Sequence, residues 1–147
     1  MFLSKQNMME TKYNQATLNR PDGDRIIDAP FVYIDLNKYR QQLKEEDAWR
    51  KNDRNSITIY KTDVLTMVLC RLHEGAMVMD NEVFGHVTMQ VLEGTVEFAV
   101  ETGNVELMQQ QMVTIHPGIM HTVRALEDSV LLISTRIEKD SNHSLRN

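Results

Sequence analysis

The chain has 147 residues, of which 41% are hydrophobic, and it carries a formal net charge of -5 at pH 7. This length and composition suffice for one domain with a single core, and the acidic balance argues against a nucleic-acid partner, which would need clustered Lys and Arg. Cys70 is the only cysteine, which excludes an intrachain disulfide and a zinc site made of several thiolates.

The first 24 residues are polar, show neither helical nor strand periodicity, and contain the turn cluster Asn19 to Gly23. Charged residues interrupt residues 1–16 where a signal peptide would need an unbroken apolar stretch, and no later run has the length of a membrane span. We therefore expect an extended N-terminal arm on a cytoplasmic protein that has no membrane partner.

One short surface helix is predicted before the strands begin. Pro30 precedes the apolar run Phe31 to Ile34, which suits an edge strand, and Asn37 is a plausible cap for a helix over residues 38–51. The apolar line of this helix covers only its first half, so we expect it to lie on the surface, with the Trp49 ring packed against the sheet.

From Ser56 onward the chain reads as short strands separated by turns, which predicts a β-sandwich or barrel and excludes a βαβ architecture. We expect one domain in all, with the arm and helix at residues 1–55, the barrel at residues 56–137 and a polar tail at residues 138–147. The predicted strands are 57–61, 64–73, 77–79, 84–92, 95–101, 105–108, 111–115, 121–126 and 130–137.

Two stretches of this region resemble the cupin superfamily, and they look closest to its small single-domain members of unassigned function. The first runs from Gly75 to the strand and Glu-Gly turn that end at Gly94, and the second from Gln111 through Pro117 and Gly118 to His121. The resemblance implies an all-β fold, the cupin double-stranded β-helix or jelly-roll barrel. It says less about function, because this fold serves enzymes and binding proteins alike.

The cupin resemblance also implies a set of four metal ligands, three in the first motif and one in the second. Counting between Gly75 and Gly94, the first-motif positions fall on Asn81, Val83 and Val87, while His121 matches the second. Valine has no lone pair to give and an Asn carbonyl is a weak donor, so the inherited metal site is predicted to be degenerate or rebuilt.

A rebuilt site would need donors from elsewhere, for which the candidates are His73, His86, His116, Asp80 and Glu82. If Val87 points inward, its neighbour His86 points outward, because adjacent strand residues face opposite sides. A bulge near Gly85 would bring His86 inward to form a metal pair with His121. We expect His73 to face away from the core and His116 to lie on a surface loop.

Alternation places His121 in the barrel, and three roles for it stay open. It could orient a small ligand, be a core histidine locked in one tautomer, or be a metal ligand. A buried ring nitrogen without a partner costs on the order of 1–3 kcal/mol, so some partner is required. The predicted ligand-binding residues are Asn81, Val87, Met89, Val91, His121 and Val123.

Two functions and an assembly state follow from these residues. The first function is binding or sensing of a small apolar or weakly polar molecule, with no cofactor expected. The alternative is a metal-dependent enzyme of dioxygenase or isomerase type, with a divalent transition metal held by His121, His86 and Glu82. In addition, both faces of residues 64–72 are apolar, so the face bearing Met67 and Leu69 needs cover from the helix, the arm or a second subunit. We predict a homodimer that uses this face.

Overall fold

The computed structural model describes residues 11–80 and 84–137. A hairpin of β1 (Lys12–Asn14) and β2 (Arg25–Asp28) comes first, followed by helices α1 (Leu36–Glu45) and α2 (Asp47–Lys51). Nine strands follow, close to the predicted ranges: β3 (Arg54–Lys61), β4 (Leu65–Leu72), β5 (Met77–Asp80), β6 (His86–Glu93), β7 (Thr95–Val100), β8 (Gly103–Met108), β9 (Met112–Ile115), β10 (His121–Ala125) and β11 (Ser129–Arg136). The fold is all-β, as the sequence predicts.

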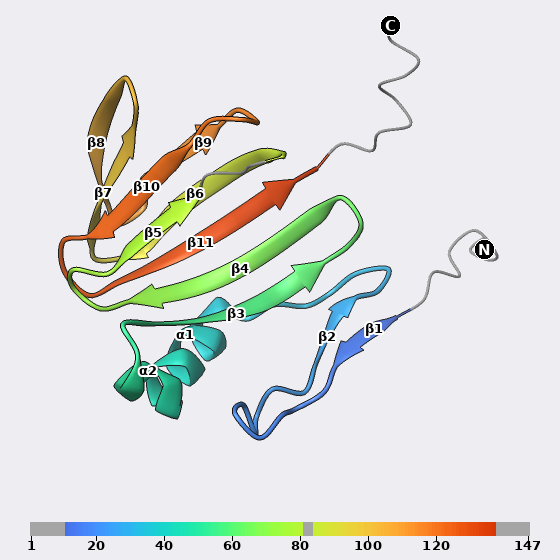
Figure 1. Ribbon diagram of the computed structural model, residues 1–147. Coiled ribbons are helices and arrows are strands. Elements are labelled where there is room, and N and C mark those ends of the chain that lie inside the picture. The colour runs from blue at the N-terminus through green and yellow to red at the C-terminus, as the bar shows by residue number, and fades with distance from the viewer. Residues whose placement is uncertain (1–10, 81–83, 138–147) are drawn as a thin grey trace, which may run out of the picture.

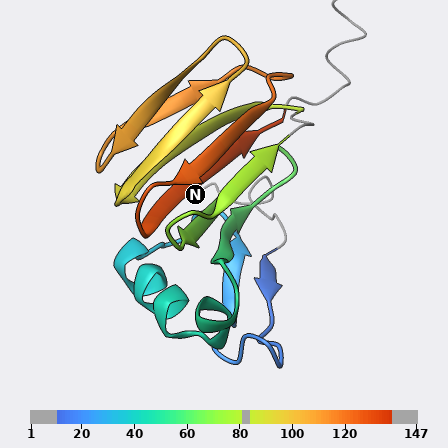
Figure 2. The same cartoon turned by 60° about the vertical axis from the view of Figure 1, so that its left-hand side comes forward.

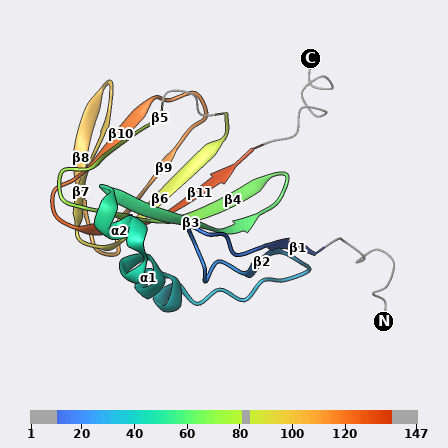
Figure 3. The same cartoon turned by 60° about the horizontal axis from the view of Figure 1, so that its bottom comes forward.

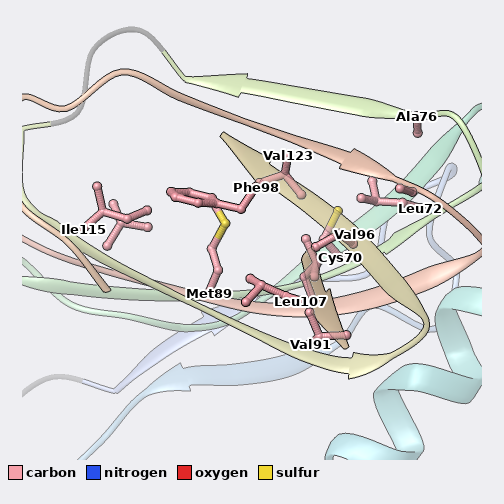
Figure 4. Close-up of a cluster of buried hydrophobic side chains, with 13 residues drawn as sticks. Cys70, Leu72, Ala76, Met89, Val91, Val96, Phe98, Leu107, Ile115 and Val123 are labelled. Atoms are coloured by element: carbon pink, nitrogen blue, oxygen red, sulfur yellow. The ribbon is translucent and has the colours of Figure 1, made fainter. Parts of the chain in front are cut away.

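The nine strands form two antiparallel sheets that face each other (Figure 1). The larger sheet has the order β3-β4-β11-β6-β9 and the smaller sheet the order β5-β10-β7-β8. Alternate side chains of both sheets point into the space between them and form one apolar core (Figure 4). Figure 4 shows Met89 of β6 and Phe98 of β7 extending toward one another across this core.

A second apolar cluster lies on the outer face of the larger sheet. Leu43 of α1 is fully buried there against Leu69 of β4 and Ile57 of β3. Figures 2 and 3 show the helices and the β1–β2 hairpin on the side of β3 that faces away from the smaller sheet. Of the three covers considered for the outer face of residues 64–72, the helix therefore covers Leu69.

The helical segment differs from its prediction in its cap and in its continuity. The N-cap is Asp35 rather than Asn37, and its carboxylate accepts hydrogen bonds from the backbone N–H groups of Asn37 and Lys38 at 3.1 and 3.3 Å. Glu46 adopts extended backbone angles (φ -74°, ψ 150°) and divides the predicted helix into α1 and α2. Within the described ranges, no helix is long and apolar enough to cross a membrane.

The predicted edge strand at Phe31 to Ile34 is wrong. Phe31 and Tyr33 are 83% and 82% exposed, and no strand among the described residues pairs with this segment. The preceding residues Arg25–Asp28 form β2 instead, paired with β1. A short apolar run without a neighbouring strand cannot satisfy its backbone groups as a sheet, which explains the outcome.

Candidate functional site

The strand registers place His121 in the outermost row of the smaller sheet, at one end of the barrel. Across β10, Val123 pairs with Phe98 of β7 and with Val78 of β5, and His121 lies one row further out, opposite Asp80. The ring centroids of His121 and Phe98 lie 5.9 Å apart with an interplanar angle of 31°. His121 is thus the polar group beside an aromatic side chain at this end of the core.

The imidazole of His121 is 3% exposed and is fixed through one nitrogen. Nδ1 lies 3.0 Å from the carbonyl oxygen of Ile119. A carbonyl oxygen can only accept, so this contact assigns the proton to Nδ1 and leaves the lone pair of the neutral ring on Nε2. Among the described residues Nε2 has no hydrogen-bond partner, so in the neutral ring it offers an acceptor.

The apolar residues that were predicted to bind a ligand lie together in the core. Val87, Met89 and Val91 of β6 and Val123 of β10 are between 0% and 3% exposed. Val91 is in register with Leu131 of β11 and Val87 with Thr135, so Val91 lies further along β6 than Val87. The sixth predicted residue, Asn81, lies outside the described residues.

Sequence reasoning missed the side chains that β4 and β11 place at the same end. Thr66 and Thr135 pair with each other, and Thr135 also pairs with Val87. Both threonines are half-buried and alternate with core residues of their strands, so their side chains face the barrel. The alternation of inward and outward residues along β4 and β11 could have identified these two threonines from the sequence. Four further residues are apolar, half-buried and packed on the same core: Val78, Val100, Val113 and Ile133.

The residues described at the inherited metal position do not fit a bound metal ion. Val87 offers no donor atom and is buried among apolar side chains. Asn81, Glu82 and Val83 lie outside the described residues, as does the side chain of Asp80. In the parts of the chain that are described, no three His, Cys, Asp or Glu side chains come together in a way that could hold a metal.

The structure does not bring His86 and His121 together. His86 is exposed, whereas its neighbour Val87 is buried, so β6 is regular at this point and His86 faces outward. The register of β6 with β11 shows no shift at His86, and a Cβ at Gly85 would overlap with the backbone carbonyl of Arg136. Close backbone approach therefore explains this glycine.

The two other candidate histidines lie outside the barrel. The His73 ring is stacked on Trp49, with 3.4 Å between the ring centroids, and its Nε2 lies 2.7 Å from the carbonyl oxygen of Trp49. His73 therefore helps to anchor α2. His116 is exposed beyond the end of β9, beside His86.

Cys70 belongs to the apolar core between the two sheets. Its thiol is free and buried, and burial raises the pKa from 9.0 to about 11. At neutral pH the side chain is therefore a thiol packed as a small apolar group, without the thiolate character of a nucleophile.

A separate groove of about 1300 Å³ lies outside the barrel, between residues 18–24 and the two helices. Polar and charged side chains dominate its walls, among them Asp22, Lys38, Glu45 and Lys51. None of the predicted site residues that the structure describes lines it.

The comparisons with known proteins define the fold. No protein-family model matches the sequence, and no curated protein matches it. A cupin superfamily protein from Desulfitobacterium hafniense DCB-2 matches in structure with a TM-score of 0.57 and 18% identity, over 59% of this chain and 80% of that one. The Cupin_2 domain of an XRE family transcriptional regulator from Enterobacter cloacae matches with a TM-score of 0.55 and 13% identity, over 60% of this chain and 100% of that one.

A larger protein also matches. Salicylate 1,2-dioxygenase from Pseudoaminobacter salicylatoxidans gives a TM-score of 0.65 and 13% identity, over 76% of this chain but only 35% of the dioxygenase. The chain therefore has the cupin fold, and the resemblance read from its two motifs is confirmed at the level of the fold.

Proposed function

We propose that this chain binds or senses a small apolar or weakly polar molecule at the His121 end of the barrel. The observation that carries the proposal is His121 itself, a buried imidazole whose Nδ1 is held by the Ile119 carbonyl within an apolar wall. Such a wall holds a ligand by burial, and a few fixed polar groups orient it. The likeness to a cupin domain of a transcriptional regulator supports a sensing role.

The chemistry of the site indicates the class of ligand. Nε2 accepts a hydrogen bond, so the ligand presents an O–H or N–H group to it. The Phe98 ring beside His121 suits a flat or aliphatic body. Thr66 and Thr135 on the facing sheet add hydroxyl groups for one further polar atom.

Phenol and toluene are matched probes for this site, because they share a ring and differ in one O–H donor. We expect phenol to bind more tightly than toluene, and His121→Leu to remove this preference while toluene still binds. The expected loss for phenol is several-fold to about tenfold, since a neutral hydrogen bond contributes roughly 0.5–1.5 kcal/mol. Titrations followed by ligand-observed NMR give both affinities.

His116→Leu is the matched control, because it makes the same substitution at an exposed histidine outside the barrel. It should leave both affinities unchanged. Failure of both probes to bind the folded protein would count against the binding function. An equal loss of affinity for phenol and toluene in the His121 variant would count against an acceptor at Nε2.

The alternative function is a metal-dependent enzyme of dioxygenase or isomerase type with a site around His121. The structural likeness to salicylate 1,2-dioxygenase supports it, whereas the outward position of His86 removes one of its expected ligands. Elemental analysis of protein purified without chelator separates the two functions. The exposed histidines His86 and His116 are replaced in this protein, because surface imidazoles can bind metal ions themselves and would add to the measured content.

Stoichiometric transition metal that disappears in His121→Ala would overturn the metal-free binding function. Protein that takes up no metal even after loading would overturn the enzyme. A metal ion at His121 would occupy the same Nε2 lone pair that accepts the hydrogen bond, so the phenol titration uses protein freed of metal.

A further inference from the structure

His86 and His116 form a pair of exposed imidazoles on the outer side of the barrel. Their ring centroids lie 5.5 Å apart and the rings are tilted by 51°. Both side chains are exposed, so neither ring contributes to the core. The sequence places these residues 30 positions apart, and only the pairing of β6 with β9 brings them together.

The strand register explains their approach. Val87 of β6 pairs with Ile115 of β9, and both of these side chains are buried in the core. His86 and His116 each lie one residue beyond this pair and on the opposite face, because adjacent strand residues alternate. A paired β-ladder holds the two backbones, so little backbone freedom would be lost on binding a ligand between the rings.

The separation of the rings suits one metal ion between them. Imidazole nitrogens bind zinc at about 2.0–2.1 Å, which places the centres of two rings on a tetrahedral ion on the order of 5 Å apart. The observed separation of 5.5 Å between the ring centroids is close to this value. Imidazole is also a favoured ligand of nickel and copper.

We propose that His86 and His116 together bind a divalent transition-metal ion, such as Zn²⁺, Ni²⁺ or Cu²⁺, on the outer surface of the barrel. Two protein ligands leave the remaining coordination positions to water or to donors from a second copy of the chain. The site is separate from the barrel interior and from the His121 site, so it does not depend on the function proposed above.

One neighbouring charge opposes the ion. Arg136 of β11 is in register directly opposite His86, on the side away from His116. Its guanidinium disfavours a second cation nearby, so Arg136→Gln should tighten metal binding. The direction of this effect is a specific consequence of a site at His86.

Calorimetric titration of ZnCl₂ and NiCl₂ into the full chain without a histidine tag tests the proposal. Loss of a residue that merely supports a metal ligand weakens metal binding roughly 10- to 100-fold. His86→Ala and His116→Ala each remove a ligand itself, so each should weaken binding by more than this, and the double variant should show no binding. Electron paramagnetic resonance with Cu²⁺ should show two imidazole nitrogens in the wild type and one in each single variant.

The matched control is Thr88→Ala with Thr114→Ala, a registered pair on the same two strands and the same face. Metal affinity should be unchanged in it, and circular dichroism should show that every variant is folded. Binding that persists in the double histidine variant, or a copper spectrum without two nitrogens in the wild type, would overturn the proposal. A stoichiometry of one ion per chain or one ion per two chains is consistent with it and identifies what completes the coordination.

Discussion

Gly94 lies in the turn between β6 and β7, where both the backbone angle and the neighbouring atoms require a glycine. Its φ is +84°, and a Cβ at this position would overlap with the Ser129 hydroxyl and the Asp128 carbonyl oxygen. Gly94→Ala should therefore lower the free energy of unfolding by about 2 kcal/mol or more, which urea denaturation measures. Gly103→Ala is the control, because a Cβ at that position would face open space, with no neighbouring atom within 4 Å; an equally large loss there would contradict the explanation.

Cys70 gives a prediction about pH. Its pKa is about 11 in the folded protein against 9.0 for the free thiol, because burial disfavours the thiolate. Above pH 9 the unfolded chain loses this proton first, so stability falls as pH rises toward 11. Between pH 8 and pH 10 the loss should be about 1 kcal/mol. Urea denaturation of the wild type and Cys70→Ala should show this component in the wild type only, and parallel profiles would contradict it.

Individual residues were predictable where strand alternation decides their direction. Val87, Met89, Val91, Val123 and His121 could be placed in the core from the period of two alone. Contacts between distant strands could not be read in this way. The approach of His116 to His86 requires the pairing of β6 with β9, and the fixing of His121 by Ile119 requires the local turn geometry.

At the scale of elements, Glu46 joins the N-terminal hairpin region to the helices and to the larger sheet. Its carboxylate accepts hydrogen bonds from Arg20, Gln42 and Asn55, at 3.0 to 3.2 Å, and its side chain is 10% exposed. Partial burial raises the pKa of Glu46, but these hydrogen bonds outweigh burial and lower it overall. The break between α1 and α2 at Glu46 places this carboxylate among its three donors.

Glu46→Gln should destabilise the fold by about 1–3 kcal/mol, because it weakens hydrogen bonds to a charged group. A lowered pKa in the folded state means that the contribution is present above the unfolded pKa and is lost as pH falls through the folded pKa. The difference in unfolding free energy between wild type and variant should therefore shrink from pH 7 to pH 3. Asp47→Asn, at the exposed Asp47–Arg50 pair, is the control and should have little effect.

The bounds of helices and strands were predicted well where turns separate alternating runs. They were predicted poorly where tertiary contacts determine where an element begins or ends. The Glu93-Gly94 turn separates β6 from β7 and the Pro117-Gly118 turn separates β9 from β10, and these strands form as expected. The helix reads as continuous because nothing local distinguishes Glu46, and its hydrogen bond with Arg20 comes from a separate segment of the chain. Asp35 is as good a cap as Asn37 by residue type, so only the backbone angles separate them.

At the scale of the whole molecule, the order of strands in the two sheets creates the site. β10, which carries His121, lies between β5 and β7, while β6 lies between β11 and β9 in the facing sheet. The polar groups at this end therefore come from strands distant in the sequence. Periodicity predicts which side of each strand is buried, but the order of the strands had to come from the resemblance to cupins.

We propose that two copies associate through the part of the outer sheet face that the helices leave half-buried. Leu69 is covered by α1, but Leu65, Met67 and Leu132 on the same face are only half-buried. Met67→Lys should place a charge in this interface and convert a dimer to a monomer, whereas Met108→Lys, at a residue that is 54% exposed on β8, should not. Sedimentation velocity at micromolar concentration measures the oligomeric state of the wild type and of both variants, and a monomeric wild type would contradict the proposal. In that case α1 and the N-terminal hairpin would be the whole cover of this face, because a chain of this size tolerates three scattered half-buried apolar side chains on its surface.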